Sequence, residues 1–144
     1  MRKVKFKVFA RKEKTICKAL SIDVSRGGEY GIVFVEYPDK GRATLGLSFV
    51  DLMQYTGLKD KYEKEIYEGD IVYSFNSRLI QHYDSEIELE YDEMDGIVIF
   101  EDGNFKLENL FGETKNTYLS IYSFEEFEEF EVVGNIHENK EFLK

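Results

Sequence analysis

Cysteine, histidine, alanine and tryptophan are scarce or missing in this chain of 144 residues. The one cysteine, Cys17, excludes an internal disulfide bond, and with only two histidines the chain lacks the spacing of a zinc site. Only three alanines are present, which excludes a helical bundle because alanine is the strongest helix former. No apolar run approaches the ~20 residues of a membrane-spanning helix, and no cleavable leader is recognisable. We therefore expect a cytoplasmic protein without membrane partners.

Motifs for catalysis and for nucleotide binding are missing as well. Gly27, Gly28 and Gly31 follow neither Walker nor dinucleotide-binding spacing. The segment Asp92–Gly96 is superficially similar to a calcium loop, but Met94 stands where such a loop needs an oxygen ligand. Cys17 lies in an alternating apolar stretch, where a buried small side chain is expected. The sequence therefore predicts a protein that is not an enzyme and has no catalytic residue, metal or cofactor.

Aromatic and β-branched residues are abundant. They make up 48 of the 144 residues, one third of the chain, and such residues favour strands. The predicted fold class is mainly β, with at most one or two short helices. Composition changes near residue 50, so we expect an N-terminal β-rich region, 1–50, followed by a C-terminal domain, 51–144.

Charge is divided unevenly along the chain. Residues 1–72 contain 14 Lys or Arg and 11 Asp or Glu, a net of +3, whereas residues 73–144 contain 5 and 18, a net of −13. A basic N-terminal half and an acidic C-terminal half favour electrostatic complementarity between subunits. An acidic protein repels nucleic acid unless one face is locally positive. The plain alternative is that both surfaces are simply solvated.

Alternating apolar residues predict a β-meander in the N-terminal region. Its third strand is apolar on both faces, as is typical of a central strand, and Pro38–Gly41 has the composition of the turn that follows it. The strands expected here are Val4–Val8, Ile16–Val24, Tyr30–Tyr37 and Leu45–Phe49.

The C-terminal domain begins with two short extended pieces around a charged turn, Lys59–Lys64. A bend at Glu68-Gly69-Asp70 leads into a strand, Ile71–Phe75, because Gly69 permits a sharp change of direction and Asp70 can accept a backbone N–H. Residues 76–86 have no period, which indicates an exposed loop. The strand Ile87–Tyr91 then carries carboxylates on one face, and these are Glu86, Glu88 and Glu90. They are expected to protect an edge strand, with contact to a basic partner or weak cation binding as alternatives.

The strongest local signal is Asp102-Gly103 between two alternating runs, which predicts a tight hairpin. Phe124, Phe127 and Phe130 are three residues apart, a spacing that fits either a short amphipathic helix starting near Ser123 or an extended strand. Val132, Val133 and Ile136 indicate a closing strand that Gly134 interrupts.

Three stretches resemble the YopX-like family of phage and prophage proteins: the opening MRKVKFKVF, Gln54–Val72 and Val132–Asn139. Members often carry Asn-Gly in the turn where this chain has Tyr62-Glu63. The resemblance implies a small β-barrel of the Src homology 3 type in the C-terminal part, after an N-terminal β-rich region, and the cytoplasm of a bacterial host as the location. It implies no known activity. The residues expected to shape the chain are Gly57, Gly69, Asp70, Asp102, Gly103 and Gly134.

Tyrosines and lysines alternate around the family motif and suggest an interaction surface. Tyrosine supplies rigid contact area for a protein partner, and on a lysine-lined surface it can also stack nucleic-acid bases. Alternatively, Tyr55 and Tyr67 simply brace the neighbouring strands. The residues of this surface are Tyr55, Lys59, Lys61, Tyr62 and Tyr67, with Lys5 and Lys7 from the basic N-terminal strands.

The sequence predicts an accessory protein that binds protein, either as a homo-oligomer or with a host or phage partner. Two other functions stay open. The basic strands with Lys5 and Lys7 could bind nucleic acid, and the acidic second half could imitate DNA and occupy a host nucleic-acid-binding protein.

Overall fold

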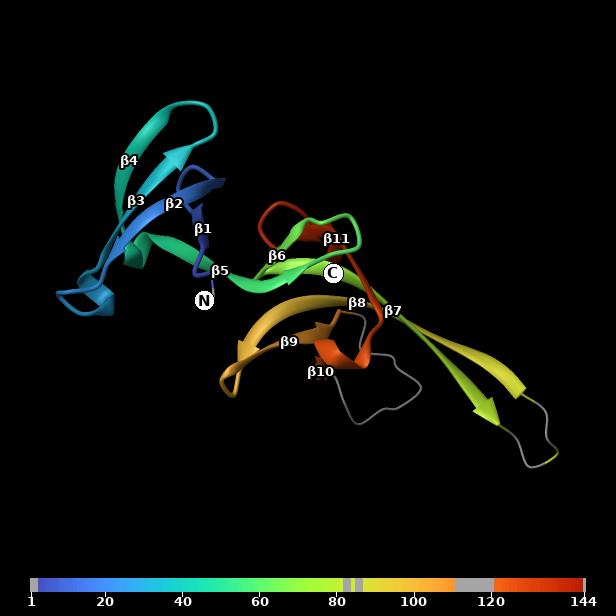
Figure 1. The fold of residues 1–144 in the computed structure, drawn as a ribbon. Coiled ribbons are helices and arrows are strands. Elements are labelled where there is room, and N and C mark those ends of the chain that lie inside the picture. The colour runs from blue at the N-terminus through green and yellow to red at the C-terminus, as the bar shows by residue number, and fades with distance from the viewer. Residues whose placement is uncertain (1–2, 82–83, 85–86, 111–120, 144) are drawn as a thin grey trace. The chain divides into compact units, whose positions relative to one another are not determined.

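The computed structural model describes residues 3–81, 84, 87–110 and 121–143, and Figure 1 shows its ribbon. The strands form two sheets of antiparallel pairs, with the orders β4-β3-β2-β1-β5-β6 and β10-β9-β8-β7-β11. The mainly β fold class is confirmed. The chain divides into two compact units, Met1–Gly57 and Leu58–Lys144, and the boundary predicted near residue 50 falls at the first residue of β5.

The first unit is built from β1 to β4, which pair consecutively, and from β5, which returns to pair with β1 and whose last two residues belong to the second unit. Their bounds are Phe6–Ala10 for β1, Thr15–Asp23 for β2, Ile32–Tyr37 for β3, Gly41–Gly46 for β4 and Val50–Lys59 for β5. One face of this sheet holds the core, formed by Val8, Ala10, Cys17, Val33, Val35, Tyr37 and Val50. Cys17 is buried, as predicted.

Two predictions in this unit are wrong in part. Leu47–Phe49 forms a 3-10 turn instead of extending the strand. The Leu47 N–H donates to the carbonyl of Gly31 at 2.9 Å, and the chain then turns to enter β5. The third strand is not buried on both faces either, because the side chain of Phe34 is 44% exposed while Val33 and Val35 are buried.

The second unit is built from six strands, of which β7 pairs with both β8 and β11. Their bounds are Glu65–Tyr67 for β6, Asp70–Gln81 for β7, Ile87–Glu101 for β8, Asn104–Asn109 for β9, Ile121–Ser123 for β10 and Glu129–Asn135 for β11. Its core is made of Ile66, Val72, Met94, Val98, Leu107 and Phe124.

The predicted loop over residues 76–86 is wrong for its first half. β7 continues to Gln81 and stays paired with β8 through Gln81↔Ile87. In Figure 1 these ends of β7 and β8 project from the other strands of the second unit. The backbones of the two strands stay paired along this segment, which the absence of an apolar period in the sequence did not indicate. The side chains of Glu86, Glu88 and Glu90 lie outside the described residues.

The predicted hairpin at Asp102-Gly103 is confirmed. Glu101 pairs with Asn104, and the turn residues have φ angles of 52° and 79°, the positive values that such a turn requires. The closing strand is confirmed too, with a register shift between Val132 and Gly134 in β11.

The described helical segments are short 3-10 turns, which agrees with the expectation of at most one or two short helices. They are Gly28–Tyr30, Leu47–Phe49, Phe124–Glu126 and Lys140–Leu143. The phenylalanine repeat is thus divided between structures, with Phe124 in a 3-10 turn and Phe130 in β11. Across the described parts of the chain, no helix has the length and apolar character needed to cross a bilayer.

Candidate functional site

A buried carboxylate fixes the charged turn that follows β5. Asp60 is 6% exposed and accepts three backbone N–H groups, from Tyr62 and Lys64 at 2.9 Å each and from Val132 at 3.0 Å. Burial raises the pKa of Asp60, but the three N–H donors together outweigh burial, so its pKa lies below the ordinary value. Asp60 therefore ties the turn to β11.

This turn presents part of the predicted interaction surface. Tyr62 is 69% exposed, and the Lys61 Nζ lies 5.3 Å from the centroid of its ring. Lys61 Nζ is also 3.5 Å from a carboxylate oxygen of Glu131, and Lys59 Nζ is 3.6 Å from one of Glu63. Both lysines are therefore partly neutralised, and Tyr62 is the exposed aromatic group of this turn.

The other predicted tyrosines are buried. Tyr55 is 5% exposed and Tyr67 is 6% exposed, which suits the bracing role weighed for them better than a contact role. The Lys5 Nζ lies 5.5 Å from the Tyr55 ring centroid, and the Tyr55 N–H donates to the Lys5 carbonyl. Lys5, Lys7 and Tyr55 belong to the first unit.

The remaining members of the predicted surface belong to the second unit. They are Lys59, Lys61, Tyr62 and Tyr67. The structure therefore brings together the residues of the turn and, separately, Lys5 with Tyr55.

The residues expected to shape the chain have clear structural positions. Gly69 has a φ of 87°, and Asp70 accepts the Tyr67 N–H at 2.8 Å across that bend. A Cβ on Gly134 would lie 2.6 Å from the Oδ1 of Asn139. Gly57 has a φ of 87° within β5. Each of these positions has a local structural reason.

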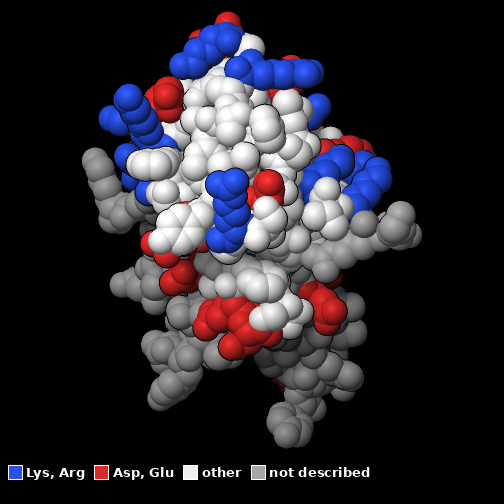
Figure 2. All heavy atoms as spheres, turned by 90° about the vertical axis from the view of Figure 1, so that its left-hand side faces the viewer, with Lys and Arg blue, Asp and Glu red and all other residues white. Residues whose placement is uncertain are grey.

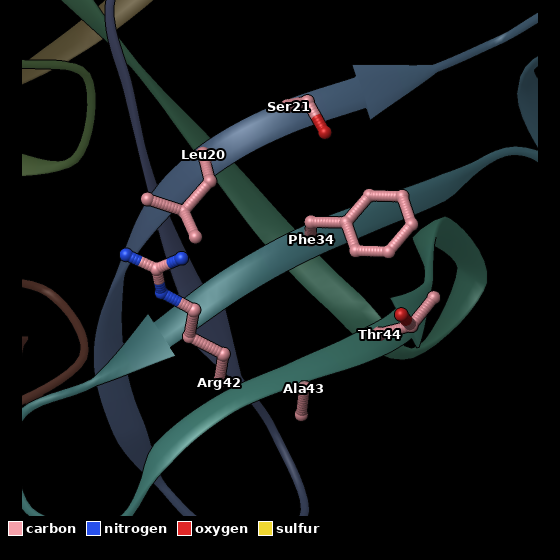
Figure 3. Close-up of a pocket in the computed structure, with 6 residues that line it drawn as sticks. All are labelled: Leu20, Ser21, Phe34, Arg42, Ala43 and Thr44. Carbon is pink, nitrogen blue, oxygen red and sulfur yellow. The ribbon is translucent and has the colours of Figure 1, made fainter.

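Sequence reasoning missed a shallow groove on the first unit. The groove has a volume of about 490 Å³ and is lined by Leu20, Ser21, Phe34, Arg42, Ala43 and Thr44. In Figure 3 the six residues stand on β2, β3 and β4, with Arg42 directed toward Leu20 and Ala43 directed to the other side of β4. The alternation of Phe34 with Glu36 in β3 was the available signal, since a face that carries a glutamate is in contact with solvent.

The division of charge is sharper between the two units than between the two halves of the sequence. Met1–Gly57 contains 11 Lys or Arg and 6 Asp or Glu, a net of +5, while Leu58–Lys144 contains 8 and 23, a net of −15. In Figure 2, Lys and Arg side chains border an uncharged area on the upper part of the face in view. Each unit therefore has its own electrostatic character.

A second acidic group in the second unit, besides Asp60, has a shifted pKa. Burial, together with the neighbouring charge of Glu93, raises the pKa of Asp95. Within the described ranges, no group of three or more His, Cys, Asp or Glu side chains is placed to hold a metal ion.

Comparisons with known proteins give a family and a fold. A family model described as YopX protein matches residues 5–144, in agreement with the resemblance seen in the motifs. The crystal structure of protein EF1440 from Enterococcus faecalis is similar over 100% of this chain and 100% of that chain, with 23% sequence identity and a TM-score of 0.55. At this identity the likeness shows the fold alone. No curated protein matches the chain.

Proposed function

The chain belongs to the YopX protein family, and we propose that it is a non-enzymatic, phage- or prophage-encoded accessory protein that acts in the bacterial cytoplasm by binding protein. The observation that carries this proposal is the division of charge between the units, +5 against −15. Oppositely charged surfaces on one chain favour association of unlike units from different copies, and they steer charged partners toward each unit.

We also propose that the second unit is a small barrel of the Src homology 3 type. In support, β7 pairs with both β8 and β11. The strand of this sheet that comes first in the chain, β7, therefore lies beside the strand that comes last, β11. The 3-10 turn Phe124–Glu126 stands shortly before the closing strand. Such small barrels are scaffolds that carry varied surfaces, so this assignment adds no activity of its own.

Affinity capture combined with light scattering tests the protein-binding proposal. The tagged chain is incubated with lysate of the bacterial host, with and without phage infection, and the captured proteins are quantified at low and at high salt. We expect either a defined partner or self-association, each weakened by salt. A monomer that captures no protein under either condition contradicts the proposal.

Nucleic-acid binding is a second candidate function, favoured by the net charge of +5 on the first unit. It predicts salt-sensitive binding of duplex DNA or RNA, because released counterions supply most of such affinity. Replacing Lys5 and Lys7 together by glutamate should weaken that binding. Fluorescence anisotropy of a labelled duplex at low salt decides the matter, and no binding there excludes this candidate.

A further inference from the structure

We propose that the open edge of β4, with the groove beside it, docks an extended acidic segment of a partner protein, which adds to the sheet of the first unit as one further strand. This inference rests on the protein-binding function proposed above, and it names the surface and the chemistry of the partner.

The edge of β4 has backbone groups aimed outward. The Leu47 N–H donates to the Gly31 carbonyl, so these two residues form a hydrogen-bonded pair. Hydrogen-bonded pairs alternate along an antiparallel ladder, so Val33↔Leu45 and Val35↔Ala43 are hydrogen-bonded as well. The intervening pairs, Phe34↔Thr44 and Glu36↔Arg42, are then the non-hydrogen-bonded ones. The N–H and C=O groups of Arg42 and Thr44 therefore point away from β3, toward the side on which the described sheet ends.

The other strands that end the two sheets suit pairing less well. β6 and β10 have three residues each. β11 carries Glu129 and Glu131 and has a register shift, and its Phe130 carbonyl already accepts the Lys61 N–H. By contrast β4 has six residues and a regular register without proline or a bulge, and Arg42 is its one charged side chain, so it is less protected than the other edges.

The groove supplies contacts for alternate side chains of an added strand. Side chains directly opposite one another in a sheet share a face, so a residue opposite Thr44 would lie on the face of Phe34. The side chains of Phe34 and Leu20 are 44% and 39% exposed and offer an apolar surface there. A valine or isoleucine at that position would extend this apolar surface on the outer side of Thr44, and the residue two positions along would lie beside Arg42.

The charge of the site selects an acidic segment. The Arg42 Nε is 3.6 Å from a carboxylate oxygen of Glu36, and both side chains are exposed, so this ion pair is weak and leaves guanidinium donors for a carboxylate. Lys18 stands in the same row of paired residues. Pairing of β4 with β4 of a second copy would bring two units of net charge +5 together, which disfavours that occupant.

A designed peptide tests the site on the full-length protein. The probe is a short fluorescein-labelled peptide with a central valine, a glutamate two residues to either side and threonine between them. Fluorescence anisotropy should show binding that falls about tenfold or more when the glutamates are replaced by lysine, or when alternate backbone nitrogens are methylated. In nuclear magnetic resonance spectra the peptide should shift the amides of Arg42 and Thr44 and slow their exchange with solvent.

Variants of the protein locate the binding. Phe34→Ser and Arg42→Glu should each weaken the peptide about tenfold. The matched controls Phe49→Ser and Arg26→Glu change exposed residues of the same unit outside the groove and should leave the affinity unchanged. Equal binding to all four variants, or no binding of the peptide to the unmodified protein, overturns the proposed site.

The outcome can be separated from that of the proposed function. If a protein captured from lysate is held equally well by the Phe34→Ser and Arg42→Glu variants, the docking site is wrong while protein binding stands. If the chain captures no partner and does not self-associate, the proposed function fails whatever the peptide does.

Discussion

At the scale of single residues, the carboxylate of Asp60 organises the part of the chain that carries the family motif. Three backbone N–H groups converge on it, one of them 72 residues away in sequence. The sequence predicted a turn in the segment around Asp60, and Glu63 in that turn adopts the αL conformation with a φ of 65°. The partner Val132 lies too far along the chain to be predicted from local pattern.

Replacing Asp60 by asparagine should lower the free energy of unfolding by about 2 kcal/mol, because an amide has one acceptor oxygen and faces a third donor with its own N–H groups. Urea unfolding monitored by circular dichroism measures the loss. The control Asp102→Asn changes an aspartate that is 82% exposed, and it should change stability by less than about 0.5 kcal/mol. Equal effects of the two substitutions would contradict the role of Asp60.

The same group predicts a dependence on pH. The pKa of Asp60 is lowered in the folded state, so its contribution to stability is fully present above the ordinary value of 3.8 and is lost as the pH falls through the lowered folded value. The stability difference between the unmodified chain and Asp60→Asn should therefore shrink below about pH 4. A difference that stays constant between neutral and acidic pH would show that the carboxylate charge is not involved.

Ser74 is a buried hydroxyl without a hydrogen-bond partner among the described residues. It is fully buried in β7, with Met94 and Phe130 as its cross-strand neighbours. Ser74→Ala should raise the free energy of unfolding by about 1 kcal/mol, because it removes the cost of burying an unpaired hydroxyl. The exposed Ser48→Ala serves as the control, and a clear loss of stability in Ser74→Ala would reveal a partner for the hydroxyl.

At the scale of elements, the turns and alternating strands were predictable and the extent of pairing was not. The pair Asp102-Gly103 predicts the hairpin because few residues tolerate two positive φ angles in succession. The extension of β7 was not predicted because residues 76–81 show no apolar period, although their backbones pair with β8. The groove was not predicted because Phe34 is an apolar residue on the solvent-facing side of a strand whose other face is buried.

The bulge in β11 offers a test at this scale. A Cβ on Gly134 would press on Asn139, whose Oδ1 accepts the Asn135 N–H at 3.1 Å. Gly134→Ala should therefore cost about 1–3 kcal/mol in urea unfolding. In the background of Asn139→Ala the same substitution should cost much less, since the obstructing side chain is gone. Additive costs in the double variant would exclude this contact as the cause.

At the scale of the whole molecule, the chain joins a basic unit to an acidic one, and the proposed function follows from that division. The linear sequence indicated a contrast between its halves, and the unit boundary at Gly57 makes it larger. Composition gives the sign and size of the net charge of each unit, but it does not identify the partner that binds there. That is why the class of function stays a proposal here and the partner must be found by experiment.

Sedimentation velocity at about 20 mM and about 500 mM salt tests this claim most directly, because the higher concentration screens interactions between exposed charges. We expect the full chain, alone or with its captured partner, to form a larger species at low salt that dissociates at high salt. The variant Lys12→Glu with Lys14→Glu, which reverses two exposed charges of the basic unit, should weaken it at low salt. A sedimentation profile identical at both salt concentrations and in the variant would contradict the account.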